Sequence, residues 1–209
     1  MSTRTFASIA LLAAAAGLGA TAWFALKPAS DDPFAQCRAS AVSGGAGAIG
    51  GPFEVVREDG VTVTDADIFT KPTLLYFGYT FCPDVCPLDS MRNADAQRLL
   101  EERGYDVQTA FISIDPNRDT PEVVADFTDL FHDNMIGFTG SPDQISTASK
   151  AFKTYFNAHT EEDPDYYLVD HSTFSYLVMP DTGFAEFFRR EDSPETMAER
   201  TACFIDAAK

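Results

Sequence analysis

Hydrophobic and polar positions follow an alternating pattern in most of the chain. Three short apolar runs typical of buried strands are each followed by a segment typical of a helix. The strands are expected at 73–79, 107–114 and 135–140, and the helices at 86–104, 120–132 and 141–156. Strands that alternate with helices predict a sheet with parallel strands and right-handed crossovers between them.

Hairpin signals lie at both ends of this region. Two short β-prone runs surround Glu-Asp-Gly within 53–65, and the chain closes with strands at 172–180 and 184–190 and an amphipathic helix at 193–208. A terminal hairpin must add antiparallel strands to the parallel ones. We therefore predict a thioredoxin-like α/β fold for 52–209, with a central mixed sheet flanked by helices. In such a fold the working residues lie where the first core strand meets its helix.

The apolar side of the first helix and a long acidic loop complete this pattern. Met91, Leu99 and Leu100 mark the apolar side of that helix, and Gly104 marks its end. The segment "NAHTEEDPDYY" (157–167) buries little apolar surface and is predicted to be a mobile loop.

An uncharged apolar run precedes the domain. Residues 6–26 follow Arg4, and as a helix of roughly 30 Å they are long enough to cross a bilayer core. We interpret 1–27 as an N-terminal membrane anchor. A cleaved signal peptide is the alternative, because "ATA" at 20–22 has the small residues of a cleavage site. Residues 28–51 are rich in Pro, Gly, Ala and Ser and are predicted to be a flexible tether to an exported domain.

Length and charge limit the classes of function. The 209 residues suffice for one domain of ordinary size and an additional segment. The formal net charge of −17 argues against binding to nucleic acid, because such a chain cannot neutralise a run of phosphates. The charge is compatible with a soluble acidic surface or with a basic protein partner.

Candidate chemistry lies at the junction between the first core strand and its helix. In "GYTFCPDVCP" (78–87), three residues separate Cys82 from Cys86, and a proline follows each cysteine. Unpaired N–H groups and the helix dipole at such a junction favour the thiolate, the form that attacks disulfides and binds metals. The spacing alone leaves three interpretations open: a structural disulfide, a redox pair and half of a metal site.

A distant histidine favours the metal site. His132 and His159 are expected to be structural or solvent-exposed, whereas His171 precedes a strand in the loop that faces the cysteine junction in a thioredoxin-like fold. Asp170, the neighbouring residue in the sequence, is a candidate to orient the His171 ring or to contact the metal ligands without binding the metal itself. Two thiolates and one imidazole make a poor structural zinc site, which takes four ligands, but they suit copper in either oxidation state.

Four blocks of the sequence carry a family pattern. They are "IGGPF", "LLYFGYTFCPDVCP", "SIDPNRDTP" and "VDHST". In this order and at these separations the blocks resemble the Sco/SenC family of copper-binding assembly proteins, over about residues 49–190. Phe81 departs from the pattern, since many family members have a polar residue or histidine there. The departure leaves the ligands intact and bears on the partner surface.

The resemblance implies a function and a location. Members of the family bind copper through two cysteines and a distal histidine, which correspond here to Cys82, Cys86 and His171. They are membrane-anchored and assist assembly of the CuA centre of cytochrome c oxidase. For this chain the resemblance implies one bound copper, Cu(I) or Cu(II), and a single-pass position in the bacterial inner membrane with the domain in the periplasm. The implied partners are the CuA-bearing oxidase subunit, a periplasmic copper donor and a thioredoxin-like reductant.

A second function stays open. Some bacterial members of the family are linked to thiol–disulfide exchange, in which Cys82 would attack, Cys86 would resolve and His171 would only tune the thiolate. His171 discriminates between the two functions, because a thioredoxin-like reductant needs no histidine there. We expect a copper chaperone rather than an enzyme.

Two further cysteines and three aspartates are candidate functional residues. Outside the cytosol, Cys37 and Cys203 most simply form a disulfide that pins the tether to the domain. Asp115 and Asp119 follow a core strand at its carboxyl end, where they either shape docking and the metal pocket or hold the turn before the next helix. Asp84 is either a helix cap or a contact to a partner.

Overall fold

The computed structural model describes residues 33–40, 42, 45–161, 163 and 166–209. Residues 34–209 form one compact unit. The predicted anchor, residues 1–27, lies outside the described residues, and no described helix is long and apolar enough to cross a membrane. The boundaries that separate anchor, tether and domain stay predictions.

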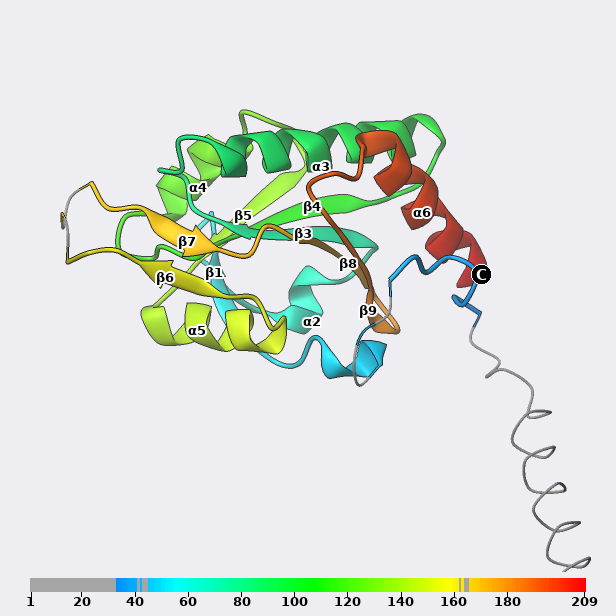
Figure 1. Ribbon diagram of the computed structural model, residues 1–209, viewed down its shortest axis with the longest axis horizontal. Coiled ribbons are helices and arrows are strands. Elements are labelled where there is room, and N and C mark those ends of the chain that lie inside the picture. Colours follow the sequence, from blue (N-terminus) through cyan, green and yellow to red (C-terminus); the bar gives the residue numbers. More distant parts are fainter. Residues whose placement is uncertain (1–32, 41, 43–44, 162, 164–165) are drawn as a thin grey trace, which may run out of the picture. The chain divides into compact units, whose positions relative to one another are not determined.

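Within the described residues, seven strands form one mixed sheet in the order β2-β1-β5-β4-β3-β8-β9 (Figure 1). The strands are β1 (Glu54–Arg57), β2 (Thr62–Thr64), β3 (Thr73–Gly78), β4 (Gln108–Ser113), β5 (Met135–Thr139), β8 (Ser175–Met179) and β9 (Gly183–Phe188). β3, β4 and β5 are parallel, and the two hairpins add antiparallel strands at the edges. The predicted central mixed sheet is confirmed. β3 and β4 are buried along their whole length, as expected for strands covered on both faces.

Helices cover both faces of this sheet, with α3, α4 and α6 on one side and α2 and α5 on the other (Figure 1). The helices are η1 (Ala46–Ala48), α2 (Asp65–Ile68), α3 (Val85–Glu102), α4 (Pro121–Thr128), α5 (Pro142–Ala151) and α6 (Pro194–Ala207). Thr120, Ser141 and Ser193 accept hydrogen bonds from backbone N–H groups at the starts of α4, α5 and α6, and a proline follows each. These caps explain why the predicted helix starts lie next to the observed ones.

α3 buries a different face from the one predicted. Of the three residues predicted to form its apolar side, Leu100 is fully buried and Leu99 is half-buried, but Met91 is 46% exposed and lies outside the buried face. The buried residues of α3 are Cys86, Asp89, Ser90, Asn93, Ala94, Ala96, Gln97 and Leu100. Several of these side chains are polar and have hydrogen-bond partners inside the domain. A rule based on apolar spacing cannot find a buried face of this kind.

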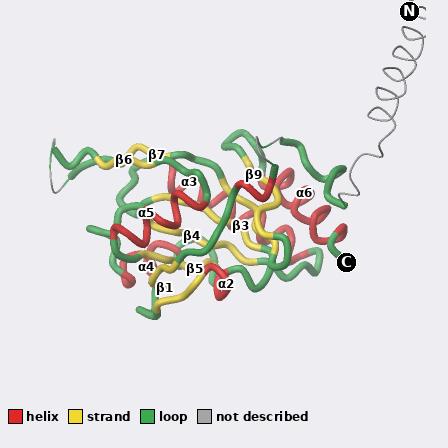
Figure 2. Tube along the Cα trace, turned by 90° about the horizontal axis from the view of Figure 1, so that it is seen from below, coloured by secondary structure: helices red, strands yellow, loops and turns green. Residues whose placement is uncertain are grey.

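The predicted acidic loop connects two strands that the sequence pattern did not indicate. β6 (Phe156–Ala158) pairs antiparallel with β7 (Val169–His171), and this hairpin projects from the main sheet (Figure 2). α5 ends at Ala151 rather than at 156, because the backbone of Lys153 takes a positive φ of 54° and the chain then turns into β6. His171 therefore lies in a strand rather than in a loop.

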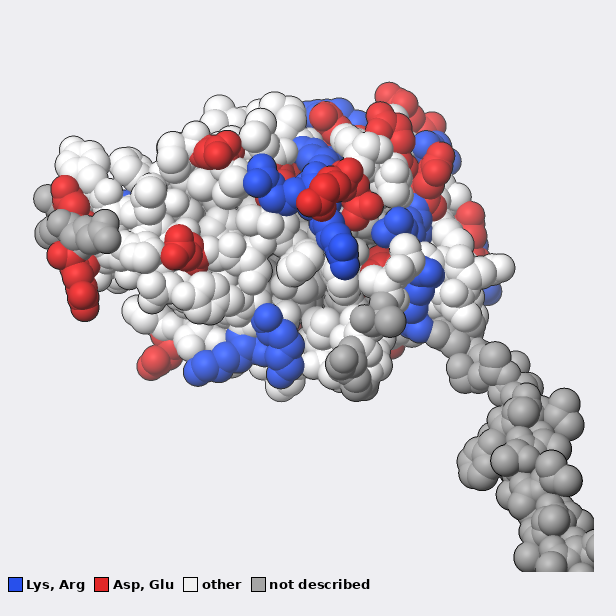
Figure 3. Space-filling view, in the orientation of Figure 1, with Lys and Arg blue, Asp and Glu red and all other residues white. Residues whose placement is uncertain are grey.

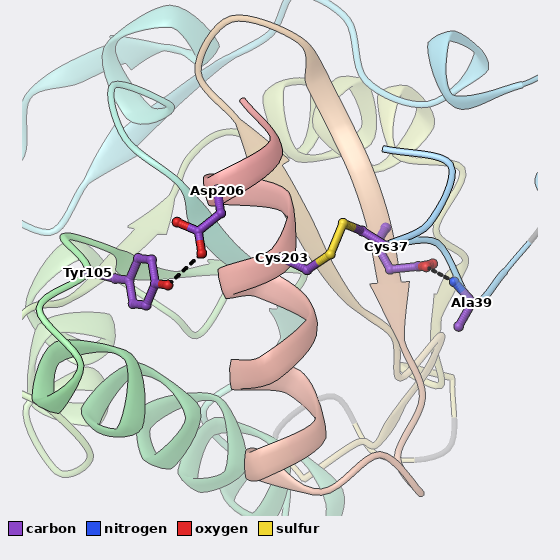
Figure 4. The surroundings of a disulfide bond; sticks show 6 residues. Cys37, Ala39, Tyr105, Cys203 and Asp206 are labelled. Carbon is purple, nitrogen blue, oxygen red and sulfur yellow. Dashed lines mark hydrogen bonds between the residues drawn. A yellow bond between two sulfur atoms is a disulfide. The ribbon is translucent and has the colours of Figure 1, made fainter. Parts of the chain in front are cut away.

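A disulfide joins Cys37 to Cys203 of α6, which confirms the predicted pairing (Figure 4). Near it, the buried carboxylate of Glu186 in β9 accepts hydrogen bonds from the N–H of Ala39 at 2.8 Å and from the hydroxyl of Ser40. These contacts hold the described residues that follow Pro33 against the domain.

We expect Cys203→Ser to lower the free energy of unfolding by about 2–4 kcal/mol, because the disulfide closes a long loop in the unfolded chain. Denaturant unfolding of the purified protein measures the change. Cys37→Ser should have the same effect, and the double variant should lose no more stability than either single one. Losses that add up in the double variant would contradict the pairing.

Candidate metal centre

The cysteine motif lies where β3 ends and α3 begins. The N–H of Cys82 donates to the carbonyl of Tyr79 and closes the turn of the loop, and Cys86 lies in the first turn of α3. No side chain fits at Gly78, because a Cβ there would lie 2.8 Å from Tyr76 Cε1 and 3.1 Å from Cys86 Sγ. The glycine thus lets the start of the helix approach the sheet closely.

Asp119 fixes the loop that leads to Cys82. Its buried carboxylate accepts hydrogen bonds from the N–H of Thr80 at 3.0 Å, from the Thr80 hydroxyl at 2.6 Å and from the Ser113 hydroxyl at 2.5 Å. Burial raises the pKa of Asp119, and the three donors oppose this rise because they favour the ionised form. Asp119 therefore holds the loop that carries Cys82.

His171 reaches the cysteines from β7. Its Nε2 lies 3.3 Å from Cys86 Sγ, and its Nδ1 lies 2.9 Å from the carbonyl oxygen of Ser172. A carbonyl only accepts hydrogen bonds, so Nδ1 carries a proton, and Nε2 is the ring nitrogen that faces the sulfur. The rings of Tyr76 and Tyr79 pack edge-on against the imidazole, with centroids 6.2 and 5.8 Å away.

The three predicted ligands therefore lie together. The sulfur atoms of Cys82 and Cys86 and a ring nitrogen of His171 are all within 4.8 Å of one another. Cys86 is fully buried, Cys82 is 7% exposed and His171 is half-buried. Two soft sulfur donors and one imidazole fit copper better than structural zinc.

One thiolate is favoured in this pair. The pKa of Cys82 is lowered well below its ordinary value, first because the Cys86 thiol donates a hydrogen bond to the Cys82 sulfur. Burial opposes this effect, whereas a hydrogen bond with His171 and the backbone N–H groups of Asp84 and Cys86 add to it. The pKa of Cys86 is raised, because this residue keeps the proton that the two sulfur atoms share and is buried. A soft cation entering the site would replace that proton.

The other two histidines lie apart from this cluster. Asp170 is exposed on the opposite side of β7, and its carboxylate lies 2.8 Å from His159 Nε2. The prediction that Asp170 orients His171 is therefore wrong. His132 is nearly buried and lies 3.3 Å from a carboxylate oxygen of Glu101, in agreement with the structural role expected for it.

A stack of one cation on two aromatic rings borders the site. The buried carboxylate of Asp115 accepts hydrogen bonds from Arg118 Nε and from the Tyr167 hydroxyl, each at 2.5 Å. The Arg118 guanidinium carbon lies 3.6 Å from the centre of the Tyr167 ring and 4.8 Å from that of Phe81. Asp115 thus ties the β6–β7 hairpin to the turn after β4. Phe81 is 49% exposed and contacts Tyr166.

The surface beside the site carries few charges. Figure 3 shows mostly uncharged side chains between the β6–β7 hairpin and the start of α3. Leu88 in α3 and Phe174 after β7 are 59% and 38% exposed. Asp84 precedes α3, but its side chain makes no capping hydrogen bond, which leaves the partner contact as the role predicted for it.

The sequence pattern did not indicate four residues that surround the ligands. They are Tyr76, Tyr79, Thr80 and Asp89. In the sequence, the first three look like ordinary strand and loop residues, because their contacts around the candidate ligands are with segments far away in the chain. The one available signal was that Asp89 follows Cys86 by three positions, which places both on one face of a helix.

The model of the SCO1/SenC family matches residues 42–206 of this chain. The chain belongs to the SCO1/SenC family. It is 49% identical over 207 residues to protein SenC of Rhodobacter capsulatus, a match that covers 99% of this chain and 93% of that protein. The resemblance seen in the sequence is thereby confirmed.

Solved structures of SCO1/SenC proteins share the fold. The structure of Arabidopsis thaliana ScoI with copper bound is 37% identical, with a TM-score of 0.70, over 76% of this chain and 99% of that chain. BsSco is a member of the Sco family of cytochrome c oxidase assembly proteins in which a disulfide switch was identified. It is 27% identical, with a TM-score of 0.58, over 73% of this chain and 91% of that chain. The domain therefore has the thioredoxin-like fold of the Sco proteins.

We expect the metal-free, reduced SCO1/SenC protein to keep one thiolate per chain at neutral pH and to lose it only in acid. The reason is that a lowered pKa keeps Cys82 ionised until the pH falls through it. A pH titration of the ultraviolet absorbance of the thiolate measures this. Cys82→Ser should remove the signal, and Cys86→Ala should raise the pKa of Cys82 because its strongest hydrogen-bond donor is lost. If the wild type formed its thiolates only at the pH at which ordinary cysteines ionise, the two sulfur atoms would not share a proton.

Proposed function

We propose that this SCO1/SenC protein is a copper chaperone that carries one copper ion at Cys82, Cys86 and His171. The approach of two sulfur atoms and one imidazole nitrogen to within 4.8 Å carries this proposal. Copper bound in Arabidopsis thaliana ScoI supports the choice of metal. The link between the Sco family and cytochrome c oxidase assembly supports the CuA centre of that oxidase as the destination.

The donor set suits both oxidation states of copper. Two thiolates suffice for the soft Cu(I), whereas Cu(II) draws more strongly on the imidazole. Copper takes the place of the proton shared by Cys82 and Cys86, so loading requires the reduced pair and releases that proton. Because Nδ1 of His171 already donates to Ser172, Nε2 is ready to act as a ligand.

Transfer of the ion needs an accessible rim around the site. His171 lies on the projecting β6–β7 hairpin, and Phe81, Leu88 and Tyr166 expose apolar surface on the adjoining segments. On this proposal the CuA-bearing subunit docks against this rim, and its own ligands displace His171 first, since a two-stranded sheet is easier to move than the main sheet. A periplasmic copper donor and a thioredoxin-like reductant would use the same rim.

The proposed location is the bacterial inner membrane, with one span formed by residues 1–27 and the domain in the periplasm. The uncharged apolar run at 6–26 supports the anchor. The disulfide between Cys37 and Cys203 supports an oxidising compartment for the domain.

We expect the reduced protein to take up one copper per chain, and Cys82→Ser or Cys86→Ser to abolish tight binding. One thiolate and one imidazole leave the ion under-coordinated. His171→Ala should weaken Cu(II) binding strongly while part of the Cu(I) affinity remains, because both thiolates are kept. Copper titration followed by dialysis measures the metal that each variant retains.

His159→Ala is the matched control, because this histidine of the same hairpin contacts Asp170 on the side away from the sulfur atoms. It should bind both oxidation states as the wild type does. Stoichiometric copper retained after both cysteines are replaced would overturn the site. A His171→Ala variant that binds both ions normally would remove His171 from it.

Delivery to the oxidase is tested separately. We expect copper to move from the loaded protein to the metal-free, reduced CuA domain when the two are mixed, and the copper content of each protein after separation measures this. Loaded His159→Ala should do the same. If the copper stays with the chaperone throughout, delivery to the CuA centre is wrong and only copper binding remains of the proposed function.

A second candidate, thiol–disulfide exchange, is favoured by one observation. Cys82 is the more exposed sulfur and favours the thiolate, whereas Cys86 is fully buried and keeps the proton. Attacking and resolving cysteines differ in this way. The His171→Ala variant separates the two functions, because a copper chaperone uses His171 as a ligand, whereas an exchange enzyme uses it only to tune the thiolate. A variant that binds copper normally but loses exchange would favour the enzyme.

A further inference from the structure

The guanidinium of Arg118, beside the candidate metal centre, has hydrogen-bond donors without partners. Its Nε donates to the buried carboxylate of Asp115 at 2.5 Å. Its two terminal nitrogens, Nη1 and Nη2, are buried and have no hydrogen-bond partner among the described residues. A guanidinium only donates hydrogen bonds, and donors that leave water without finding an acceptor cost free energy. The structure therefore leaves this cation with unmet demand for an acceptor.

Two aromatic rings cover the guanidinium. Its carbon lies over the Tyr167 ring at 3.6 Å from the ring centre and over the Phe81 ring at 4.8 Å. A ring face attracts the positive charge, but it does not replace an oxygen acceptor for the N–H groups. Tyr167 is buried, whereas Phe81 is 49% exposed and packs on Tyr166, which is 72% exposed. Movement of one exposed side chain, Phe81, would uncover this face of the cation.

Arg118 also lies between the two segments that carry the candidate ligands. Phe81 immediately precedes Cys82 in the loop after β3, and Tyr167 lies just before β7, the strand of His171. The guanidinium contacts both rings. A group that bound to Arg118 from outside would therefore act next to both segments.

A carboxylate is the group that fits these donors. A guanidinium can hold a carboxylate through two parallel N–H···O bonds, which need both terminal nitrogens. The net charge of −17 repels an acidic partner at long range, but salt screens that repulsion beyond about 10 Å. The surface between the β6–β7 hairpin and the start of α3 is mostly uncharged (Figure 3). At close range the unpaired donors of Arg118 therefore favour a carboxylate of the partner.

We propose that Arg118 is a receptor for one Asp or Glu side chain of the CuA-bearing subunit. The carboxylate displaces Phe81 and accepts hydrogen bonds from Nη1 and Nη2, so that these donors are satisfied in the complex. Because Phe81 adjoins Cys82, docking moves a side chain next to the metal centre when the acceptor arrives. The receptor rests on the proposed function, since it is a contact that the copper acceptor makes beside the same site.

The test measures the dissociation constant between the full chain and the CuA domain, both metal-free and reduced. Arg118→Gln should raise this constant about tenfold, because a hydrogen-bonded charge pair is lost. Arg118→Lys should recover only part of the loss, since an ammonium keeps the charge but lacks the planar fork. Arg103→Gln, at the far end of α3, is the control for loss of one exposed positive charge and should match the wild type.

Tyr167→Phe is the control for a loosened hairpin. It removes the hydrogen bond from the Tyr167 hydroxyl to Asp115 and leaves the Arg118 donors in place. Docking should change less than about twofold, because a single neutral hydroxyl is lost away from the contact with the partner. A loss as large as that of Arg118→Gln would show that Arg118 acts on the position of the hairpin, and would overturn the receptor.

Variants of the partner test the pair without changing Arg118. Each exposed Asp or Glu that borders the copper ligands of the CuA domain is replaced singly by Asn or Gln. With the wild-type chain, one of these variants should bind about tenfold more weakly. The same variant should lose no further affinity against Arg118→Gln, because the two groups act as one pair. Losses that add for every variant would overturn the receptor.

Two further results separate the receptor from the proposed function. Unchanged docking by Arg118→Gln would show that Nη1 and Nη2 bind only water, and would overturn the receptor while copper binding and delivery stand. Absence of docking by the wild type would overturn the receptor together with the CuA domain as acceptor. Copper retained by the chain in titration would then still support the metal site.

Discussion

Hydrogen bonds to Asp119 join the carboxyl ends of all three parallel strands. Its carboxylate binds Thr80 after β3 and Ser113 at the end of β4, and its own carbonyl accepts the hydroxyl of Thr139 at the end of β5. This edge of an α/β sheet is where ligand sites form. The loop that carries Cys82 is thus held by a turn far away in the sequence, and the position of the first sulfur depends on the sheet as a whole.

The second sulfur depends on α3 and on its polar buried face. Besides Asp89, Gln97 accepts a hydrogen bond from Thr109 at 2.7 Å, and Asn93 accepts one from Ser175 at 2.7 Å. Removing a polar group from water costs free energy, and only well-placed hydrogen-bond partners inside the protein offset this cost. Such a face contributes less to stability than an apolar one would, but it allows few alternative positions of the helix. Cys86 is thereby held in register with His171.

The parts of the fold that could be predicted are those that depend on patterns of neighbouring residues in the sequence. The strand–helix order, and the choice of Cys82, Cys86 and His171 as candidate metal ligands, follow from periodicity and donor type. The rest depends on contacts between distant segments. Met91 was misassigned because its helix buries polar groups, and β6–β7 was missed because three-residue strands carry almost no pattern. Asp170 was misassigned because neighbours in a strand face opposite sides.

The two cysteine pairs become available at different times during synthesis. Cys82 and Cys86 emerge almost together, whereas Cys37 must wait for Cys203, which lies 166 positions later. Four cysteines allow three pairings, and early closure of the near pair removes both wrong partners of Cys37. In an oxidising compartment, correct folding thus favours a newly made domain in which Cys82 and Cys86, two of the candidate ligands, are already joined as a disulfide. Each such molecule needs two electrons from a reductant before it can take up its first ion.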